Sequence, residues 1–241
     1  TRTVNVVDTT PPEITLLGAD PMTLECGVDT YAEPGATAFD ICAGDLTSSI
    51  VITGAVNTAV PGTYPVTYTV TDPAGLQDVE VRIVEVADTL PPVITCTLVR
   101  TLLWPARNGL VPPGFTASAE DACQGAVSVT VTVFSDEPDG AAPFAPDAVG
   151  SSPASLRLRM QRAYPGDGRV YLIRVTASDA SGNTASLCKS TVVPVMPVGA
   201  WILNVRAQAT AGEVACGAVD PHTGVPAGYT QLLQFTYPLV P

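Results

Sequence analysis

The sequence predicts an all-β protein made of two tandem β-sandwiches and a short β-rich C-terminal segment. Val and Thr alternate in runs such as Val66–Val70 and Ser128–Val133, and a period of two residues is typical of a strand with one buried face. The 23 prolines and 20 glycines interrupt almost every stretch that is long enough for a helix. A junction motif also occurs twice, which indicates two modules of the same kind.

The repeated junction sets the expected domain boundaries. Val4–Thr15 recurs as Val84–Thr95, at an offset of 80 residues, and each copy contains the pattern Asp-Thr-x-Pro-Pro. Prolines stiffen a connection and cannot donate to a β-ladder. We therefore expect an orphan closing strand or donor strand at 1–8, a first domain at 9–87, a second at 88–196 and a C-terminal extension or partial domain at 197–241.

A second repeated element predicts the hairpin that closes each module. Asp72–Gly75 and Asp179–Gly182 each follow an alternating strand. An Asp side chain can hydrogen-bond within its own turn, and Gly supplies a positive φ. The second module is longer by 27 residues between its junction and this element, and most of the excess falls in 135–168. That insertion is a candidate partner surface, with a long solvated hairpin as the alternative.

In two-sheet sandwiches, alternating side chains from both sheets fill one core. On this basis the sequence predicts eight buried core positions: Ile14, Phe39, Tyr68, Val70, Val131, Tyr171, Ile173 and Val175.

Charge and composition exclude several classes of partner. The net charge is −12 with 11 Lys and Arg, so most of the surface would repel nucleic acid. No segment approaches the roughly 18 apolar residues of a membrane span. The six cysteines contain no Cys-x-x-Cys pair, which favours disulfides over zinc ligands and indicates a secreted, extracellular protein.

The cysteine positions suggest one pairing and leave the others open. Cys26 and Cys42 lie in the first module on either side of Pro34-Gly35, so we expect a local bridge between them. The remaining four allow Cys96–Cys188 with Cys123–Cys216, or Cys96–Cys123 with Cys188–Cys216.

The first module resembles bacterial immunoglobulin-like surface repeats. The resemblance covers residues 11–86, and the motifs that carry it are Pro11-Pro12-x-Ile14-Thr15, Tyr31-x-x-Pro34-Gly35-Ala36-Thr37-Ala38-x-Asp40, Gly44-Asp45-Leu46-Thr47 and Pro61-Gly62-Thr63-Tyr64. It implies a seven-stranded immunoglobulin-like (Ig-like) sandwich.

The second module resembles the hyalin-repeat-like modules of exported bacterial proteins. The resemblance covers residues 91–195 and rests on Pro91-Pro92-x-Ile94-x-Cys96, Leu103-Trp104-Pro105, Ser135-Asp136-Glu137-Pro138, Gly166–Tyr171 and Asp179-x-Ser181-Gly182-Asn183. The chain departs from the family at Ala106–Gly109. Both resemblances imply adhesion, spacing or assembly, and neither implies catalytic residues.

No catalytic motif is present in the sequence. The chain has no Gly-x-Ser-x-Gly, no phosphate-binding glycine loop and no His-Glu-x-x-His, and its single histidine is His222. We therefore expect no enzyme and no obligatory cofactor. Asp136, Glu137 and Asp139 in the insertion are candidate calcium ligands, because hard cations favour clustered oxygens. Solvated surface acids explain the same residues.

The expected function is that of a non-catalytic extracellular structural or adhesive protein. Thr3–Val7 (Thr3, Val4, Asn5, Val6 and Val7) reads as a closing strand without a home domain. Donation of this strand to a neighbour would build a head-to-tail filament. The partners would be other copies of the chain or adjoining Ig-like domains. The alternative is a carbohydrate-binding accessory module of a larger secreted enzyme or adhesin, with a glycan or surface ligand as its partner.

Overall fold

The computed structural model describes residues 2–104, 108–123, 125–137, 146–161, 168–193, 213–214 and 230–239. Within these ranges the chain is nearly all β, and its one helical element is the single 3-10 turn η1 (Thr47–Ser49). The all-β class predicted from the Val/Thr alternation is therefore confirmed. The chain divides into unit 1, residues 1–90 with 122–124, and unit 2, residues 91–121 with 125–241.

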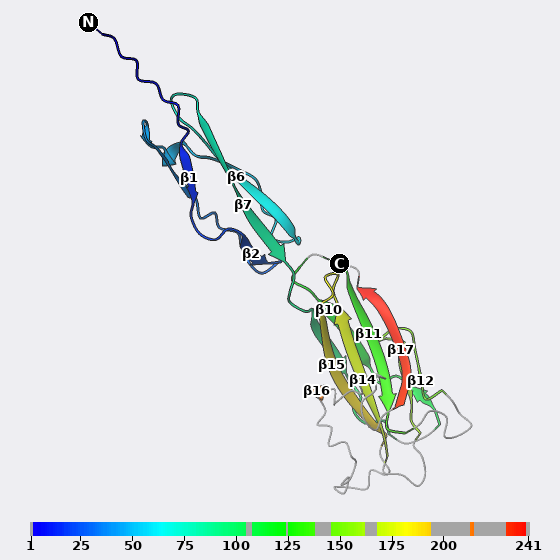
Figure 1. Ribbon diagram of the computed structural model, residues 1–241. Coiled ribbons are helices and arrows are strands. Elements are labelled where there is room, and N and C mark those ends of the chain that lie inside the picture. Colours follow the sequence, from blue (N-terminus) through cyan, green and yellow to red (C-terminus); the bar gives the residue numbers. More distant parts are fainter. Residues whose placement is uncertain are drawn as a thin grey trace. The chain divides into compact units, whose positions relative to one another are not determined.

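Unit 1 is a two-sheet sandwich (Figure 1). One sheet has the order β1-β3-β4, and the other has the order β2-β7-β6-β5. The strands are β1 (Glu13–Leu16), β2 (Met22–Glu25), β3 (Ala36–Asp40), β4 (Gly44–Asp45), β5 (Val51–Thr53), β6 (Gly62–Thr71) and β7 (Gln77–Ala87). All pairs are antiparallel except β2 with β7, which is parallel.

The core of unit 1 follows the predicted alternation in β6. Val66, Tyr68 and Val70 are 3%, 0% and 1% exposed, while the residues between them face outward or lie at the boundary. Ile14, Ala36, Ala38 and Val84 complete the cluster. The prediction of Phe39 as a core residue is wrong, because β3 turns Ala36, Ala38 and Asp40 inward and leaves Phe39 62% exposed.

The described residues of unit 2 form three sheets with the orders β10-β8, β16-β15-β14-β11-β17 and β12-β13-β9. Its strands are β8 (Val93–Leu98), β9 (Leu110–Val111), β10 (Phe115–Glu120), β11 (Val127–Ser135), β12 (Ala148–Val149), β13 (Arg157–Arg159), β14 (Arg169–Ser178), β15 (Thr184–Val193), β16 (Glu213–Val214) and β17 (Thr230–Leu239). Val131, Tyr171, Ile173 and Val175 are all 0% exposed, as predicted.

The predicted closing hairpins are present in both units. The Asp72 carboxylate accepts the backbone N–H of Leu76 at 2.8 Å, and Gly75 has φ +88°. The Asp179 carboxylate likewise accepts the N–H of Asn183 at 2.8 Å. In each case the Asp side chain replaces a ladder partner that the turn removes.

The insertion 135–168 and the C-terminal segment both contribute strands to unit 2. β12 and β13 lie inside the insertion, and Leu158 on β13 is 0% exposed. The insertion is therefore more than a solvated hairpin. From the C-terminal segment, β17 pairs antiparallel with β11 (Figure 1). This segment supplies an edge strand to the sheet of unit 2.

Candidate functional site

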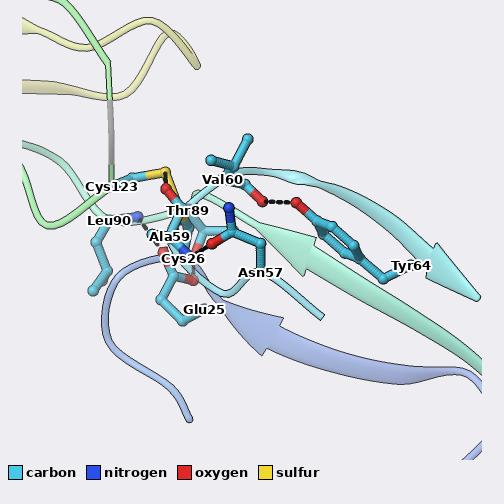
Figure 2. The surroundings of a disulfide bond; sticks show 9 residues. All are labelled: Glu25, Cys26, Asn57, Ala59, Val60, Tyr64, Thr89, Leu90 and Cys123. Atoms are coloured by element: carbon cyan, nitrogen blue, oxygen red, sulfur yellow. Dashed lines mark hydrogen bonds between the residues drawn. A yellow bond between two sulfur atoms is a disulfide. The ribbon is translucent and has the colours of Figure 1, made fainter. Parts of the chain in front are cut away.

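A disulfide between Cys26 and Cys123 lies at the end of β2 in unit 1 (Figure 2). The two Cα atoms are 5.1 Å apart, and the two residues are separated by 97 positions in the sequence. Cys26 is 1% and Cys123 6% exposed, and they form a small cluster with Val86. The segment 122–124, which belongs to unit 1, is thus joined covalently to it.

Tight backbone packing surrounds the bridge. The Cys26 N–H donates to the Ala87 carbonyl and the Gly27 N–H to the Thr58 carbonyl, both at 2.8 Å. Gly27 has φ +69°, and a Cβ at this position would lie 1.9 Å from the Ala122 carbonyl oxygen. Only glycine fits here, because a side chain would collide with backbone that cannot move aside.

Glu25 stabilises the chain next to the bridge (Figure 2). Its carboxylate accepts the Thr89 hydroxyl at 2.6 Å, the Thr89 N–H at 2.8 Å and the Leu90 N–H at 3.2 Å. The Thr89 hydroxyl and the backbone N–H groups lower the pKa of Glu25 against the opposing effect of burial. The ionised carboxylate therefore holds the Asp-Thr-x-Pro-Pro junction against the end of β2.

The expected Cys26–Cys42 bridge is wrong. Cys26 follows β2 beside the last residue of β7, whereas Cys42 follows β3 near Asp72, which precedes β7. β7 has 11 residues, which corresponds to about 33 Å at the usual rise of a strand. A disulfide requires Cα atoms within about 7 Å, so Cys42 carries an exposed thiol instead.

Three of the other four expected pairings are also corrected, and Cys188–Cys216 stays a prediction. Cys123–Cys216 and Cys96–Cys123 are excluded by the bridge from Cys123 to Cys26. Cys96 on β8 retains its thiol while Cys188 on β15 is disulfide-bonded, so a Cys96–Cys188 bridge is wrong as well. Cys188 pairs in the sheet with Val214, and Cys216 lies outside the described residues.

A second repeat in the sequence would have indicated that Cys42 and Cys123 occupy equivalent turns. The pattern Asp-x-Cys-x-Gly occurs at 40–44, directly after β3, and again at 121–125, directly after β10. Cys26 can form a disulfide with only one of these two cysteines. The repeat therefore shows that Cys123 is as good a candidate partner as Cys42, although it does not say which of them is bonded.

Two of the three calcium ligands expected in the insertion, Asp136 and Glu137, have protein partners. Arg169, 3% exposed, donates from Nε to Glu137 at 3.0 Å and pairs through Nη1 with Asp147 at 2.7 Å. The Asp136 carboxylate accepts the Val170 N–H at 2.8 Å. Asp139 lies outside the described residues. Calcium binding here stays a prediction, but Glu137 is already neutralised by a buried cation.

The same network contains Tyr171, whose hydroxyl donates to the Arg159 carbonyl at 2.8 Å. Burial raises the pKa of Tyr171 to about 12 despite the opposing charge of Arg169. Arg159 in turn pairs with Asp147 at 3.0 Å. A buried network of ion pairs and hydrogen bonds of this kind holds strands together.

Unit 1 has its own buried cation in Arg82, which is 0% exposed. Its guanidinium donates to the Tyr68 hydroxyl at 2.9 Å and to the carbonyls of Leu17, Ala19 and Gly35. Tyr68 donates in turn to Glu33. Burial raises the pKa of Glu33, but hydrogen bonds from Tyr31, Tyr68 and the Gly35 N–H outweigh it, so the net shift is downward. This network fixes the loop between β1 and β2 on the sandwich.

The expected assembly strand, Thr3–Val7, is exposed and forms no strand in the part of the chain that the structure describes. Val4, Val6 and Val7 are 80%, 89% and 77% exposed. Its role in assembly is not tested by these observations and stays a prediction.

A cluster of potential metal ligands lies where this arm meets unit 1. Asp8, Asp40 and Cys42 each place one ligand atom within 4.8 Å of the others. Desolvation, the charge and hydrogen bond of Asp8, and the charges of Asp40 and Asp72 together raise the pKa of Cys42. The sequence reasoning missed this cluster because its members are far apart in the chain and match no known binding loop.

The sandwich topology of unit 1 agrees with the resemblance stated for its sequence. Residues 14–86 match the family described as "Bacterial surface protein, Ig-like domain". This Ig-like domain lies wholly within unit 1. The hyalin-repeat-like character of unit 2 stays a prediction. A search among curated proteins finds no match.

Solved structures give only distant likenesses. A lipoprotein from Bacteroides thetaiotaomicron is 17% identical, with 79% of this chain and 81% of that chain covered and a TM-score of 0.29. Fibronectin(III)-like modules of Clostridium thermocellum are 16% identical, with 76% and 94% covered and a TM-score of 0.28. The extracellular cadherin domains 1–5 of protocadherin gamma B2 are 15% identical, with 78% and 40% covered and a TM-score of 0.34.

The described residues include no apolar helix of the length that a membrane crossing requires.

Proposed function

We propose that this chain is a non-catalytic structural part of a bacterial surface, built of tandem Ig-like modules, in which Thr3–Val7 adds a strand to a neighbouring molecule. The Ig-like domain of residues 14–86 and the disulfide support an extracellular location. The neighbour is another copy of the chain, which would make the contact head-to-tail and the assembly open-ended.

The observation that carries the proposal is the equivalence between the arm and β7. At the offset of 80 residues, Val4 corresponds to Val84 and Val6 to Val86. Val84 and Val86 are 0% and 4% exposed because they face the core of unit 1. Val4 and Val6 carry the same inward pattern but are 80% and 89% exposed. The arm therefore has the pattern of a core strand, although its two valines are exposed in the described residues.

Unit 1 also offers an edge that can accept a strand. β5 lies at the end of the order β2-β7-β6-β5, so one side of its backbone is unpaired within the described residues. All three residues of β5 are exposed, including Val51 at 59% and Ile52 at 43%. A short apolar edge of this kind is a template for β-augmentation.

The turn at Cys42 supports an end-to-end arrangement independently. Cys123, in the equivalent Asp-x-Cys-x-Gly turn, is bridged to Cys26 at the end of β2. Cys42 is exposed and carries a thiol. By the same geometry it is suited to a bridge with a cysteine at the corresponding end of another Ig-like module. The arm and the Cys42 thiol, at the same end of unit 1, are thus both suited to contact another Ig-like module.

The test compares three chains by sedimentation velocity over a concentration series. Wild type should form a concentration-dependent series of oligomers, and electron microscopy should show fibres. Val4→Asp combined with Val6→Asp should remain monomeric, because two charges would enter a core. Asn5→Asp is the matched control: it corresponds to the outward-facing Glu85, so it should assemble as wild type does.

Two results would contradict the proposal. If wild type remains monomeric at every concentration, the chain does not assemble through a donated strand. If the Val4/Val6 variant assembles as wild type does, the arm is not the strand that is donated. Monomers that bind a glycan array would favour the alternative of a carbohydrate-binding accessory module.

A further inference from the structure

The end of unit 1 at which the arm joins β1 contains buried carboxylate oxygens without partners. Asp40, the last residue of β3, is 2% exposed. Its Oδ1 accepts the N–H groups of Cys42 at 2.7 Å and Ala43 at 2.6 Å. Its Oδ2 is buried and has no hydrogen-bond partner. An ionised oxygen in that position is costly unless a positive charge accompanies it.

Asp72, in the β6–β7 turn, repeats this arrangement. It is 5% exposed, its Oδ1 accepts the Leu76 N–H at 2.8 Å, and its Oδ2 is buried without a hydrogen-bond partner. Asp40 at the end of β3 and Asp72 directly after β6 therefore share one arrangement: one carboxylate oxygen accepts backbone N–H groups, and the other is buried without a hydrogen-bond partner. The ion pairs found among the described residues involve Arg159 and Arg169 of unit 2, and none reaches Asp40 or Asp72.

Asp8 brings a carboxylate close to Asp40, and the charge of Asp72 acts on Cys42 in the same cluster. Asp8 lies in the arm, two residues before Thr10, whose N–H it accepts at 3.2 Å. One of its oxygens, one oxygen of Asp40 and the Cys42 sulfur all lie within 4.8 Å of one another. A Ca²⁺ ion lies about 2.3–2.6 Å from each of its oxygen ligands, so two oxygens on opposite sides of one ion are separated by a distance of this size.

The donor atoms indicate which cation would bind. Carboxylate oxygens are hard ligands, and Ca²⁺ accepts six to eight oxygens in flexible geometry, including backbone carbonyls and water. A thiol is a soft donor that prefers zinc or copper. Three aspartates and a single thiol therefore favour calcium, with the sulfur beside the ion rather than bound to it.

The sequence repeats supply an independent argument. Each of the three aspartates occupies a motif that recurs later in the chain: Asp8 in Asp-Thr-x-Pro-Pro, Asp40 in Asp-x-Cys-x-Gly and Asp72 in Asp-x-x-Gly. The second copies follow in the same order, with an aspartate at each corresponding position, namely Asp88, Asp121 and Asp179.

We propose that Asp8, Asp40 and Asp72 form a calcium site that fixes the arm to the end of unit 1. Asp8 would then be the ligand that orders the arm, and Asp40 and Asp72 would be the buried ligands that the fold supplies. The proposal is independent of strand donation, because it concerns a site complete within one molecule.

The experiment is isothermal titration of the chelator-treated full chain with CaCl2, together with urea unfolding with and without calcium. Wild type should bind calcium and show a higher urea midpoint in its presence. Asp40→Asn should bind one ion fewer per chain and lose the corresponding calcium-dependent shift. Its midpoint without calcium should not fall, because the variant removes an uncompensated buried charge.

Two control variants separate the site from general charge effects. Asp45→Asn makes the same change at an exposed residue of the neighbouring turn and should bind as wild type does. Cys42→Ser should also retain calcium binding. The proposal would be overturned if wild type showed neither binding heat nor a shift of the urea midpoint at a calcium concentration on the order of 10 mM, about ten times that of extracellular fluids. Unchanged stoichiometry in Asp40→Asn, or zinc binding that Cys42→Ser abolishes, would overturn it too.

Discussion

Removal of the Cys26–Cys123 bridge should strongly destabilise the chain. The two cysteines are 97 positions apart, and the chain-entropy estimate for a loop of this length is roughly 4–5 kcal/mol. Alanine is the suitable replacement, because Cys26 and Cys123 are 1% and 6% exposed and a serine hydroxyl would be buried. The Cys26→Ala/Cys123→Ala variant should therefore unfold at a much lower urea concentration than wild type.

Urea unfolding followed by far-ultraviolet circular dichroism measures this change. With m-values of about 1–3 kcal/mol/M, the midpoint should fall by about 1.5 M or more. Cys42→Ala is the control, since Cys42 is exposed and outside the bridge, and its midpoint should match that of wild type. A double variant within 0.3 M of wild type, by the same order-of-magnitude scale, or a non-reduced peptide map that joins Cys26 to Cys42, would refute the reasoning.

Other substitutions test the packing and the charge networks. Gly27→Ala should hinder closure of the bridge, because its Cβ would lie 1.9 Å from a backbone oxygen, and a thiol assay should detect unbridged chains. Arg82→Met should cost about 3 kcal/mol in urea unfolding, since the Tyr68 hydroxyl and the carbonyls of Leu17, Ala19 and Gly35 lose a buried donor. Val131→Ala should cost about 2–3 kcal/mol in the same assay, whereas Val4→Ala, at an exposed residue, should cost less than about 0.5 kcal/mol. The pKa of Glu33 is lowered, so ionised Glu33 stabilises the fold above its ordinary pKa of 4.5, and this stabilisation is lost as the pH falls through the lowered pKa. The free energy of unfolding of Glu33→Gln should therefore depend less on pH in that range.

Much of the fold follows from local patterns. Alternation in Val66–Val70 and in Ser128–Val133 predicts strands whose buried faces the structure confirms. The Asp72 turn is equally local, because its partners are within four residues. Phe39 was misplaced because hydrophobicity alone does not say which face of a five-residue strand is inward. The small Ala36 and Ala38 face the core instead.

Features that depend on distant partners could not be read in the same way. The partner of Cys26 is 97 positions away, while the nearer Cys42 is a strand's length from it in space. The carboxylates of the proposed calcium site come from the arm, from β3 and from the β6–β7 turn. The three assemble only when both sheets have formed. Glu137 is a similar case, because its carboxylate suggested a metal ligand and its partner in the structure is Arg169, 32 residues away in the sequence.

The pairing of β17 with β11 has a consequence for the order of folding. The two strands are about a hundred residues apart in sequence, yet they form a nine-position ladder from Val127↔Leu239 to Ser135↔Thr230. Until Thr230–Leu239 has emerged, one flank of β11 has an unsatisfied row of amide groups and carbonyls. Contacts of such long range form slowly and leave strand edges open to other chains. Until β17 pairs with it, therefore, β11 is an open edge of unit 2 at which a second chain can pair.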